Sequence, residues 1–157
     1  MSKKIQNNFD KLFIGGEWLS PENGKTLEIQ NPHDLTIVGT VPLASKADVD
    51  KAVAVAKQAF DKKIWWGKSI DERLTILRKF QNLLNDYAQS IAEMITLENG
   101  SSINFNKALQ EQVIPIVNNS IFEDAEQFDW ETERDNWDGS KVLVVREPVG
   151  VVAAIVP

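Results

Sequence analysis

The feature that most constrains the fold is an uninterrupted apolar run, Val149–Val156, which follows Pro148. Unbroken apolarity over the length of a strand is typical of a strand buried on both faces, as in the parallel sheet of an α/β protein. A parallel strand needs a crossover, usually a helix, and a neighbouring strand. Because only Pro157 follows the run, we expect residues 148–157 to be one strand of a sheet that these residues leave incomplete.

Composition and charge exclude several classes of function. The 157 residues suffice for one domain or slightly more. Lys and Arg total 17 against 23 acids, a net charge of -6, so we expect no nucleic-acid partner. The apolar run is far shorter than the roughly 20 residues that span a bilayer, and no apolar region follows Lys3 and Lys4. We therefore expect no membrane span, no secretory signal and a cytoplasmic location.

The residue types that carry most catalysis are scarce. The sequence contains no cysteine, which excludes disulfides, thiolate metal sites and a cysteine nucleophile. Its one histidine, His33, follows Pro32 in a predicted turn and is interpreted as a solvated side chain. No P-loop, GxGxxG turn or GxSxG motif is present. Residue types and spacing alone thus indicate no catalytic residue.

Short strands are predicted after a loose, polar segment over residues 1–11. Leu12–Leu19 is strand-like with a glycine interruption, and Thr26–Gln30 alternates in polarity. Asn23-Gly24 between them is a strong turn signal, so we expect these two segments to pair as an antiparallel hairpin. A third strand is expected over Thr36–Val41.

Helices are predicted from Ser45 onward. Ser45 with Asp48, and Ser69 with Glu72, have the spacing of capping boxes, which satisfy free N–H groups at helix starts. The second helix is expected to break near Asp86, and its later half to end at Asn99-Gly100, a typical C-cap. A further helical pattern covers 103–130, and Pro115 within it must kink that helix or start it.

Three further segments are interpreted one by one. The acidic stretch 123–138 is interpreted as a solvated helix end and connecting loop. Trp65-Trp66 lies between helices, where anchoring in the core is favoured over stacking on a ligand. After a turn at Asp138-Gly139, the β-branched segment Lys141–Arg146 predicts a strand.

Several of these segments, in this order and spacing, resemble the N-terminal part of the NAD(P)-dependent aldehyde dehydrogenases. The resemblance begins at Leu12 and extends to the end of the sequence. It rests on FIGGEW (13–18), IQNP (29–32), DVDKAV (48–53), Ala59-Phe60, Arg73 with Leu74 and Leu77, LENG (97–100) and REPVGVVAAIVP (146–157).

The resemblance implies an α/β fold with three parts: a cofactor domain, a catalytic domain and an oligomerisation hairpin. Residues 12–137 would supply the N-terminal strands and helices of the cofactor domain. Residues 138–147, with the strand 141–146, would belong to the oligomerisation element and make a homo-oligomer. Residues 148–157 would be the truncated first strand of the cofactor-binding sheet.

The resemblance also implies a chemistry. In this family a cysteine thiolate attacks the aldehyde, an asparagine helps hold the oxyanion, and hydride passes to NAD or NADP. A glutamate then activates water to release the acid. These groups lie beyond Pro157 in the family pattern, so we expect no catalytic residue in this chain, no cofactor bound by it alone, and no activity by itself.

A few site residues carry over from the family. Ile155, Val156 and Pro157 match the start of the segment that lines the cofactor. The carboxylate of Glu98 and the backbone carbonyls of Ile29 and Gln30 match a monovalent-cation site found in some members. By position alone, an acid at a helix end such as Glu98 is more often a capping or surface residue than a ligand.

Two alternatives to a dehydrogenase fragment stay open. The chain could be a non-enzymatic interaction module whose 141–146 strand adds to a sheet edge of a related subunit. It could also fold poorly alone and aggregate through its apolar end.

Overall fold

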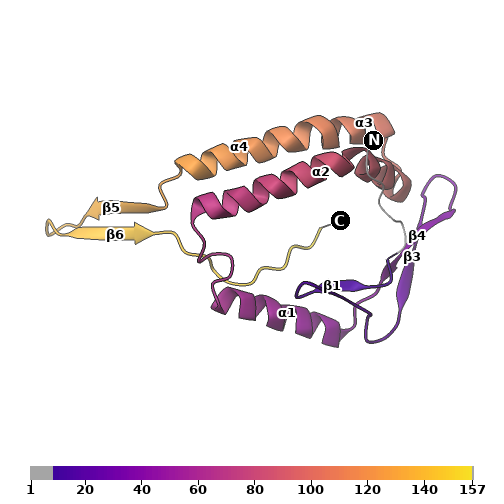
Figure 1. The fold of residues 1–157 in the computed structure, drawn as a ribbon, viewed down its shortest axis with the longest axis horizontal. Coiled ribbons are helices and arrows are strands. Elements are labelled where there is room, and N and C mark those ends of the chain that lie inside the picture. The colour runs from indigo at the N-terminus through magenta and orange to yellow at the C-terminus, as the bar shows by residue number, and fades with distance from the viewer. Residues whose placement is uncertain (1–8, 157) are drawn as a thin grey trace.

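A computed structural model describes residues 9–156 of the chain, as helices with three small strand pairs (Figure 1). Most of the predicted loose segment 1–11 lies outside the described residues; within it, the Phe9 N–H donates to the Thr40 carbonyl at 3.0 Å. The elements in chain order are β1 Leu12–Ile14, β2 Glu17–Leu19, β3 Thr26–Gln30, β4 Ile37–Pro42, α1 Lys46–Asp61, α2 Ile70–Asn99, α3 Ile103–Ala108, the π-helical turn η1 Leu109–Val113, α4 Ile114–Gln127, β5 Glu131–Asp135 and β6 Lys141–Val145.

The first four strands form two separate antiparallel hairpins, β1–β2 and β3–β4. The predicted pairing of Leu12–Leu19 with Thr26–Gln30 is therefore wrong. Gly15 and Gly16 have φ of 67° and 89°, a conformation that glycine adopts readily and that closes a two-residue hairpin turn within 12–19. The predicted third strand is confirmed as β4, which pairs with β3.

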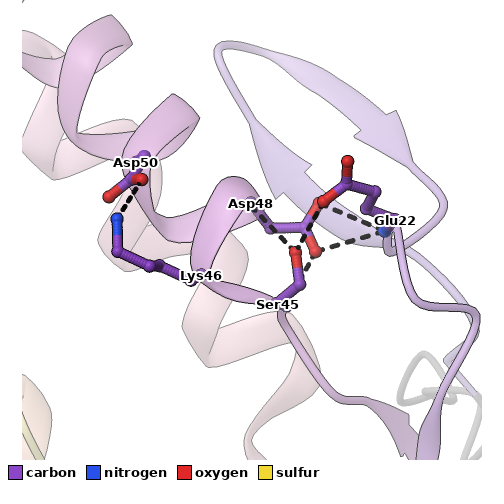
Figure 2. Close-up of polar contacts among 5 residues, drawn as sticks. All are labelled: Glu22, Ser45, Lys46, Asp48 and Asp50. Carbon is purple, nitrogen blue, oxygen red and sulfur yellow. Dashed lines mark hydrogen bonds and ion pairs between the residues drawn. The ribbon is translucent and has the colours of Figure 1, made fainter.

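Helix α1 begins at a complete capping box (Figure 2). The Asp48 N–H donates to Ser45 Oγ at 3.2 Å, and the Ser45 N–H donates to Asp48 Oδ2 at 2.8 Å. Asp48 also accepts from the Glu22 N–H at 3.2 Å, and Ser45 Oγ donates to Glu22 Oε2 at 3.2 Å. The cap therefore joins the start of α1 to the loop between β2 and β3.

Helix α2 runs unbroken from Ile70 to Asn99, so the predicted break near Asp86 is wrong. Its buried residues Leu74, Gln81 and Ala88 recur at seven-residue intervals, which keeps one face against the neighbouring helices throughout. The predicted start and end are confirmed: Ser69 and Glu72 form a capping box, and Gly100 ends the helix with φ of 76°. A Cβ at Gly100 would lie 2.9 Å from Pro32 Cγ, which also calls for glycine here.

The predicted helix over 103–130 divides into α3, η1 and α4. Pro115 lies in the first turn of α4, directly after the π-helical turn. Proline has no N–H for the helical bond and crowds the carbonyl four residues earlier, so a change of helix type at this point is expected. The prediction that Pro115 kinks or starts a helix is confirmed.

Helices α2 and α4 lie side by side and bury the main apolar contacts (Figure 1). Phe122 of α4 is 6% exposed, with the Arg78 guanidinium 5.2 Å from its ring centre, and Arg78 also pairs with Glu126 at 2.6 Å. The amide of Asn118 donates to Gln81 between the same helices. Asn106 of α3 is 1% exposed and donates to Thr96 Oγ1 at 2.8 Å, so this buried polar group has its partner.

Strands β5 and β6 form the third hairpin, which extends away from the helices (Figure 1). The predicted strand 141–146 is confirmed as β6. The loop predicted over 123–138 is wrong for Glu131–Asp135, because this acidic segment supplies the ladder partner that β6 requires. The Lys141–Asp135 ion pair at 2.5 Å closes the end of the hairpin.

The predicted strand 149–156 is not formed within the described residues, because no other segment there pairs with it. Val149 is 95% exposed and Ile155 is 93% exposed. Burial on both faces, which the apolar run predicts, requires neighbouring strands and covering helices that residues 9–156 do not supply.

Candidate functional site

The residues predicted to line the cofactor do not meet in a cavity. Ile155 and Val156 lie in the exposed segment after β6, and Pro157 lies outside the described residues. Their assignment as cofactor-lining residues stays a prediction.

The residues predicted to hold a monovalent cation come from two elements that meet at one end of the molecule. Ile29 and Gln30 end β3, and Glu98 lies in the last turn of α2, which packs against β3 (Figure 1). The ladder register shifts between Ile29 and Gln30, so the hairpin is irregular beside the end of α2. The Glu98 side chain is exposed. Cation binding by these three residues stays a prediction.

Among the described residues, no three side chains of His, Cys, Asp or Glu cluster in a way that could hold a metal ion. His33 is exposed in the turn before β4, as predicted. The backbone N–H of His33 donates to Asn31 Oδ1 at 3.0 Å, and this hydrogen bond fixes the turn.

A cavity of about 380 Å³ lies where the α1–α2 connection meets the end of β6. Trp65, Trp66 and Trp130 form its aromatic walls, and Arg73 of α2 lines it between them. The remaining lining comes from the segment Val145–Pro148, which includes Arg146 and Glu147. We call this space the tryptophan cavity.

The walls of the tryptophan cavity are fixed by hydrogen bonds. Trp66 Nε1 donates to the Phe60 carbonyl at 2.9 Å, and Trp130 Nε1 donates to the Ala125 carbonyl at 3.1 Å. The Arg146 N–H donates to the Trp130 carbonyl at 3.1 Å, which attaches the end of β6 to the same corner. Trp66 is thus anchored as predicted, whereas Trp65 is exposed, and both tryptophans border the cavity.

Residue spacing did not indicate the tryptophan cavity. Arg73, Trp130 and Arg146 lie far apart in sequence, and only the folding of α2, α4 and the β5–β6 hairpin brings them together. The sequence signal that existed was compositional: five tryptophans in 157 residues, three of which surround this space.

A second cavity of about 380 Å³ lies beside it and is mainly apolar. Ala56, Ala59 and Phe60 of α1 form one side, and Val151 and Val152 of the segment after β6 form the other. Val151 and Val152 of the C-terminal apolar run thus face this space and stay exposed.

Strand β6 has one hydrogen-bonding edge paired with β5 and the other unpaired within residues 9–156. Val142, Leu143 and Val145 are all exposed. An exposed, β-branched edge of this kind can pair with a further strand.

Comparisons with known proteins identify the family. The aldehyde dehydrogenase family profile matches residues 18–157. A geranial dehydrogenase from Castellaniella defragrans is 34% identical over 146 residues, which cover 93% of this chain and 30% of that protein. A malonate-semialdehyde dehydrogenase from Bacillus pumilus is 34% identical over 147 residues, which cover 94% of this chain and 30% of the relative.

Solved structures with a similar fold are also aldehyde dehydrogenases. An aldehyde dehydrogenase from Mycobacterium tuberculosis, complexed with NAD+, superposes with a TM-score of 0.83 at 30% identity over 91% of this chain and 29% of that one. One from Brucella melitensis gives a TM-score of 0.78 at 26% identity over 90% of this chain and 29% of the other.

The chain belongs to the aldehyde dehydrogenase family and corresponds to an N-terminal portion of its α/β fold. It spans about 30% of the length of these curated relatives. No helix within residues 9–156 is long and apolar enough to cross a membrane.

Proposed function

We propose that these residues serve as the N-terminal part of an enzyme that oxidises an aldehyde to a carboxylic acid with NAD or NADP, and that the 157-residue chain alone is inactive. The observation that carries the proposal is the family match over residues 18–157 together with the absence of cysteine. The reaction requires a thiolate to form the covalent intermediate with the aldehyde, and this chain has none to offer.

The contribution of this chain to such an enzyme is a scaffold. Helices α2 and α4 form a packed pair, and the segment after β6 presents Val151, Val152 and Ile155 to whatever completes the sheet. In that arrangement Ile155, Val156 and Pro157 would lie at the end of this strand and begin the segment that lines the cofactor. The NAD+ complex of the mycobacterial neighbour supports a nicotinamide cofactor for the complete enzyme.

A cation role for Glu98 with Ile29 and Gln30 is part of the proposal. One carboxylate and backbone carbonyls are oxygen ligands, which suit a hard cation. The packing of α2 on β3 supports it, since it brings the two segments to one end of the fold.

We further propose that β6 pairs across subunits and makes a homo-oligomer, because its second edge is unpaired among the described strands and its apolar side chains are exposed. The same edge supports the alternative, a non-enzymatic module that adds a strand to a related subunit. The proposed location is the cytoplasm, which fractionation of expressing cells checks.

Activity assays separate these roles. The purified chain is incubated with short, branched and aromatic aldehydes and either nicotinamide cofactor, and reduced cofactor is followed by absorbance. We expect no turnover above a no-protein control, and no heat of NAD or NADP binding by calorimetry. Turnover by the chain alone would overturn the proposed inactivity.

Co-purification of the chain with a complete aldehyde dehydrogenase would favour the alternative, in which β6 adds a strand to a related subunit. A chain that stays monomeric in the presence of such an enzyme would contradict that alternative.

A further inference from the structure

Two asparagines of the chain directly precede a glycine, in Asn23-Gly24 and in Asn99-Gly100. An asparagine in this position can lose its side-chain amide. The main-chain nitrogen of the glycine gives up its proton and attacks the asparagine Cγ, ammonia leaves, and water opens the cyclic imide to aspartate or isoaspartate. Glycine favours this reaction because it has no side chain to shield its nitrogen. The rate at each site therefore depends on how easily the folded chain frees the glycine nitrogen.

The Asn99-Gly100 pair is held by the packed end of α2. The Gly100 N–H donates to the carbonyl four residues earlier in the helix at 3.0 Å, and a Cβ on Gly100 would lie 2.9 Å from Pro32 Cγ. The next residue, Ser101, is bonded through its hydroxyl to Asn106, which is 1% exposed. For the Gly100 nitrogen to reach Asn99 Cγ, the last turn of α2 has to unwind and leave these contacts, and such opening is rare in a packed helix.

The Asn23-Gly24 pair lies in the loop between β2 and β3, and both residues are exposed. The Gly24 N–H donates to the Pro21 carbonyl at 3.0 Å in a turn. Chain neighbours apart, no described residue has an atom within 4 Å of the place where a Cβ of Gly24 would stand. Release of this nitrogen breaks a turn bond without disturbing a helix or a strand ladder, so we expect this loop to open far more often than the end of α2.

We propose that Asn23 is a site of spontaneous deamidation in the folded chain and that the fold protects Asn99. The two side chains are similarly prepared for attack, because Asn23 Oδ1 accepts the Lys25 N–H at 2.8 Å and Asn99 Oδ1 accepts the Ser101 N–H at 2.9 Å. The difference between them lies in the backbone. Water is the one co-reactant, so the proposal does not depend on the proposed function.

Deamidation of Asn23 changes the loop that is joined to the start of α1. The neighbouring Glu22 N–H donates to Asp48 at 3.2 Å, and Ser45 Oγ donates to Glu22 Oε2 at 3.2 Å (Figure 2). Aspartate or isoaspartate at position 23 places a further negative charge next to Glu22 in the chain, and isoaspartate also lengthens the backbone. The modification therefore alters the charge and length of the loop that the α1 cap holds.

The test compares the two sites in one sample. The purified 157-residue chain is incubated in mildly alkaline buffer, folded or in concentrated guanidinium chloride, and digested with trypsin at intervals. The tryptic peptide 12–25 contains a single asparagine and no glutamine, so the mass gained when OH replaces NH2 there reports Asn23. Fragment ions of the peptide 80–107 report Asn99. We expect Asn23 to react at least tenfold faster than Asn99 in the folded chain, and the two rates to converge in denaturant.

Asn23→Gln is expected to abolish the mass gain in the peptide 12–25, because the longer side chain closes an imide ring much more slowly. Asn99→Gln is the matched control and is expected to leave the rate at Asn23 unchanged. Circular dichroism verifies that each variant is folded, and the wild-type rates decide the proposal if a variant is not. Equal rates at the two sites of the folded chain, a faster reaction at Asn99, or no reaction at Asn23 while the denatured chain reacts would overturn the proposal.

Discussion

The helices α2 and α4 and the segment 149–156 carry similar apolar side chains in opposite surroundings. Phe122 of α4 is 6% exposed against α2, whereas Ile155 of the C-terminal segment is 93% exposed. The face of α4 that carries Phe122 is covered by α2, although Ile116 and Ile121 of α4 stay exposed, and the C-terminal segment has no such cover within the described residues. Apolar character shows that a residue is suited to burial, and only a neighbouring element decides whether burial occurs.

The sharpest test of this comparison is Phe122→Ala. Removal of the ring from between α2 and α4 is expected to lower the free energy of unfolding by about 3 kcal/mol, because it leaves a cavity as well as losing buried area. Urea denaturation followed by circular dichroism measures it. Phe80→Ala on α2, where the ring is 56% exposed, is the control and should cost less than about 1 kcal/mol. Equal losses would remove the distinction between the two surroundings.

Helix caps give a second, smaller contrast. Ser69→Ala removes the acceptor for the Glu72 N–H, a 3.2 Å bond, and should destabilise the chain by about 1 kcal/mol. Ser102 occupies the N-cap of α3 but makes no side-chain cap bond. Ser102→Ala should therefore change stability by less than about 0.5 kcal/mol. Urea denaturation measures both free-energy losses. A larger loss for Ser102→Ala than for Ser69→Ala would contradict the role assigned to the Ser69 cap.

The cap of α1 makes a pH-dependent contribution. The hydrogen bond from the Ser45 N–H, and to a smaller extent the Ser45 side chain and the Glu22 N–H, lower the pKa of Asp48 below its ordinary value of 3.8. Because the pKa of Asp48 is lower in the folded chain than in the unfolded chain, the charged carboxylate stabilises the fold at any pH above the unfolded pKa. This stabilisation is lost as the pH falls from the unfolded pKa through the lower, folded pKa. The melting temperature of Asp48→Asn should therefore lie below that of the wild type at neutral pH, with a gap that narrows in acid.

Asp50→Asn is the control for Asp48, because it removes a charge from the same helix without touching the cap (Figure 2). At neutral pH it is expected to lower the melting temperature less than Asp48→Asn does, because the Lys46–Asp50 ion pair is exposed and contributes little to stability. An Asp48→Asn gap that stays constant with pH would show that the carboxylate charge is not what matters at this cap.

The smallest expected effect is in the C-terminal segment. Ile155→Ser should change the free energy of unfolding of this chain by less than about 0.5 kcal/mol, because exposed substitutions away from special features are nearly neutral. A loss as large as that of Phe122→Ala would show that the segment is packed in solution and would break the comparison directly.

Local features were predictable where their partners are close in sequence. The capping boxes at Ser45 and Ser69 and the C-cap at Gly100 each depend on atoms within one helical turn. The family resemblance was likewise carried by short motifs, and residues 18–157 match the family as expected.

Some outcomes were missed because another segment of the chain decides them, and one because a local turn was misinterpreted. The Glu131–Asp135 segment, expected as a loop, is a strand because β6 lies beside it. The strand pairing of residues 12–30 was misjudged because the tight Gly15-Gly16 turn was interpreted as an interruption. The tryptophan cavity escaped prediction because its arginine and tryptophans come from separate elements.

The sequence by itself determined the family, the absence of a cysteine nucleophile and the capped starts of α1 and α2, since each is written in residue identities or short spacings. Tertiary structure alone decided which strands pair, which apolar faces are covered and that Arg73 reaches a cavity walled by tryptophan. The reason is physical: caps and turns form within a few residues, whereas burial and pairing depend on chain segments that only folding brings together.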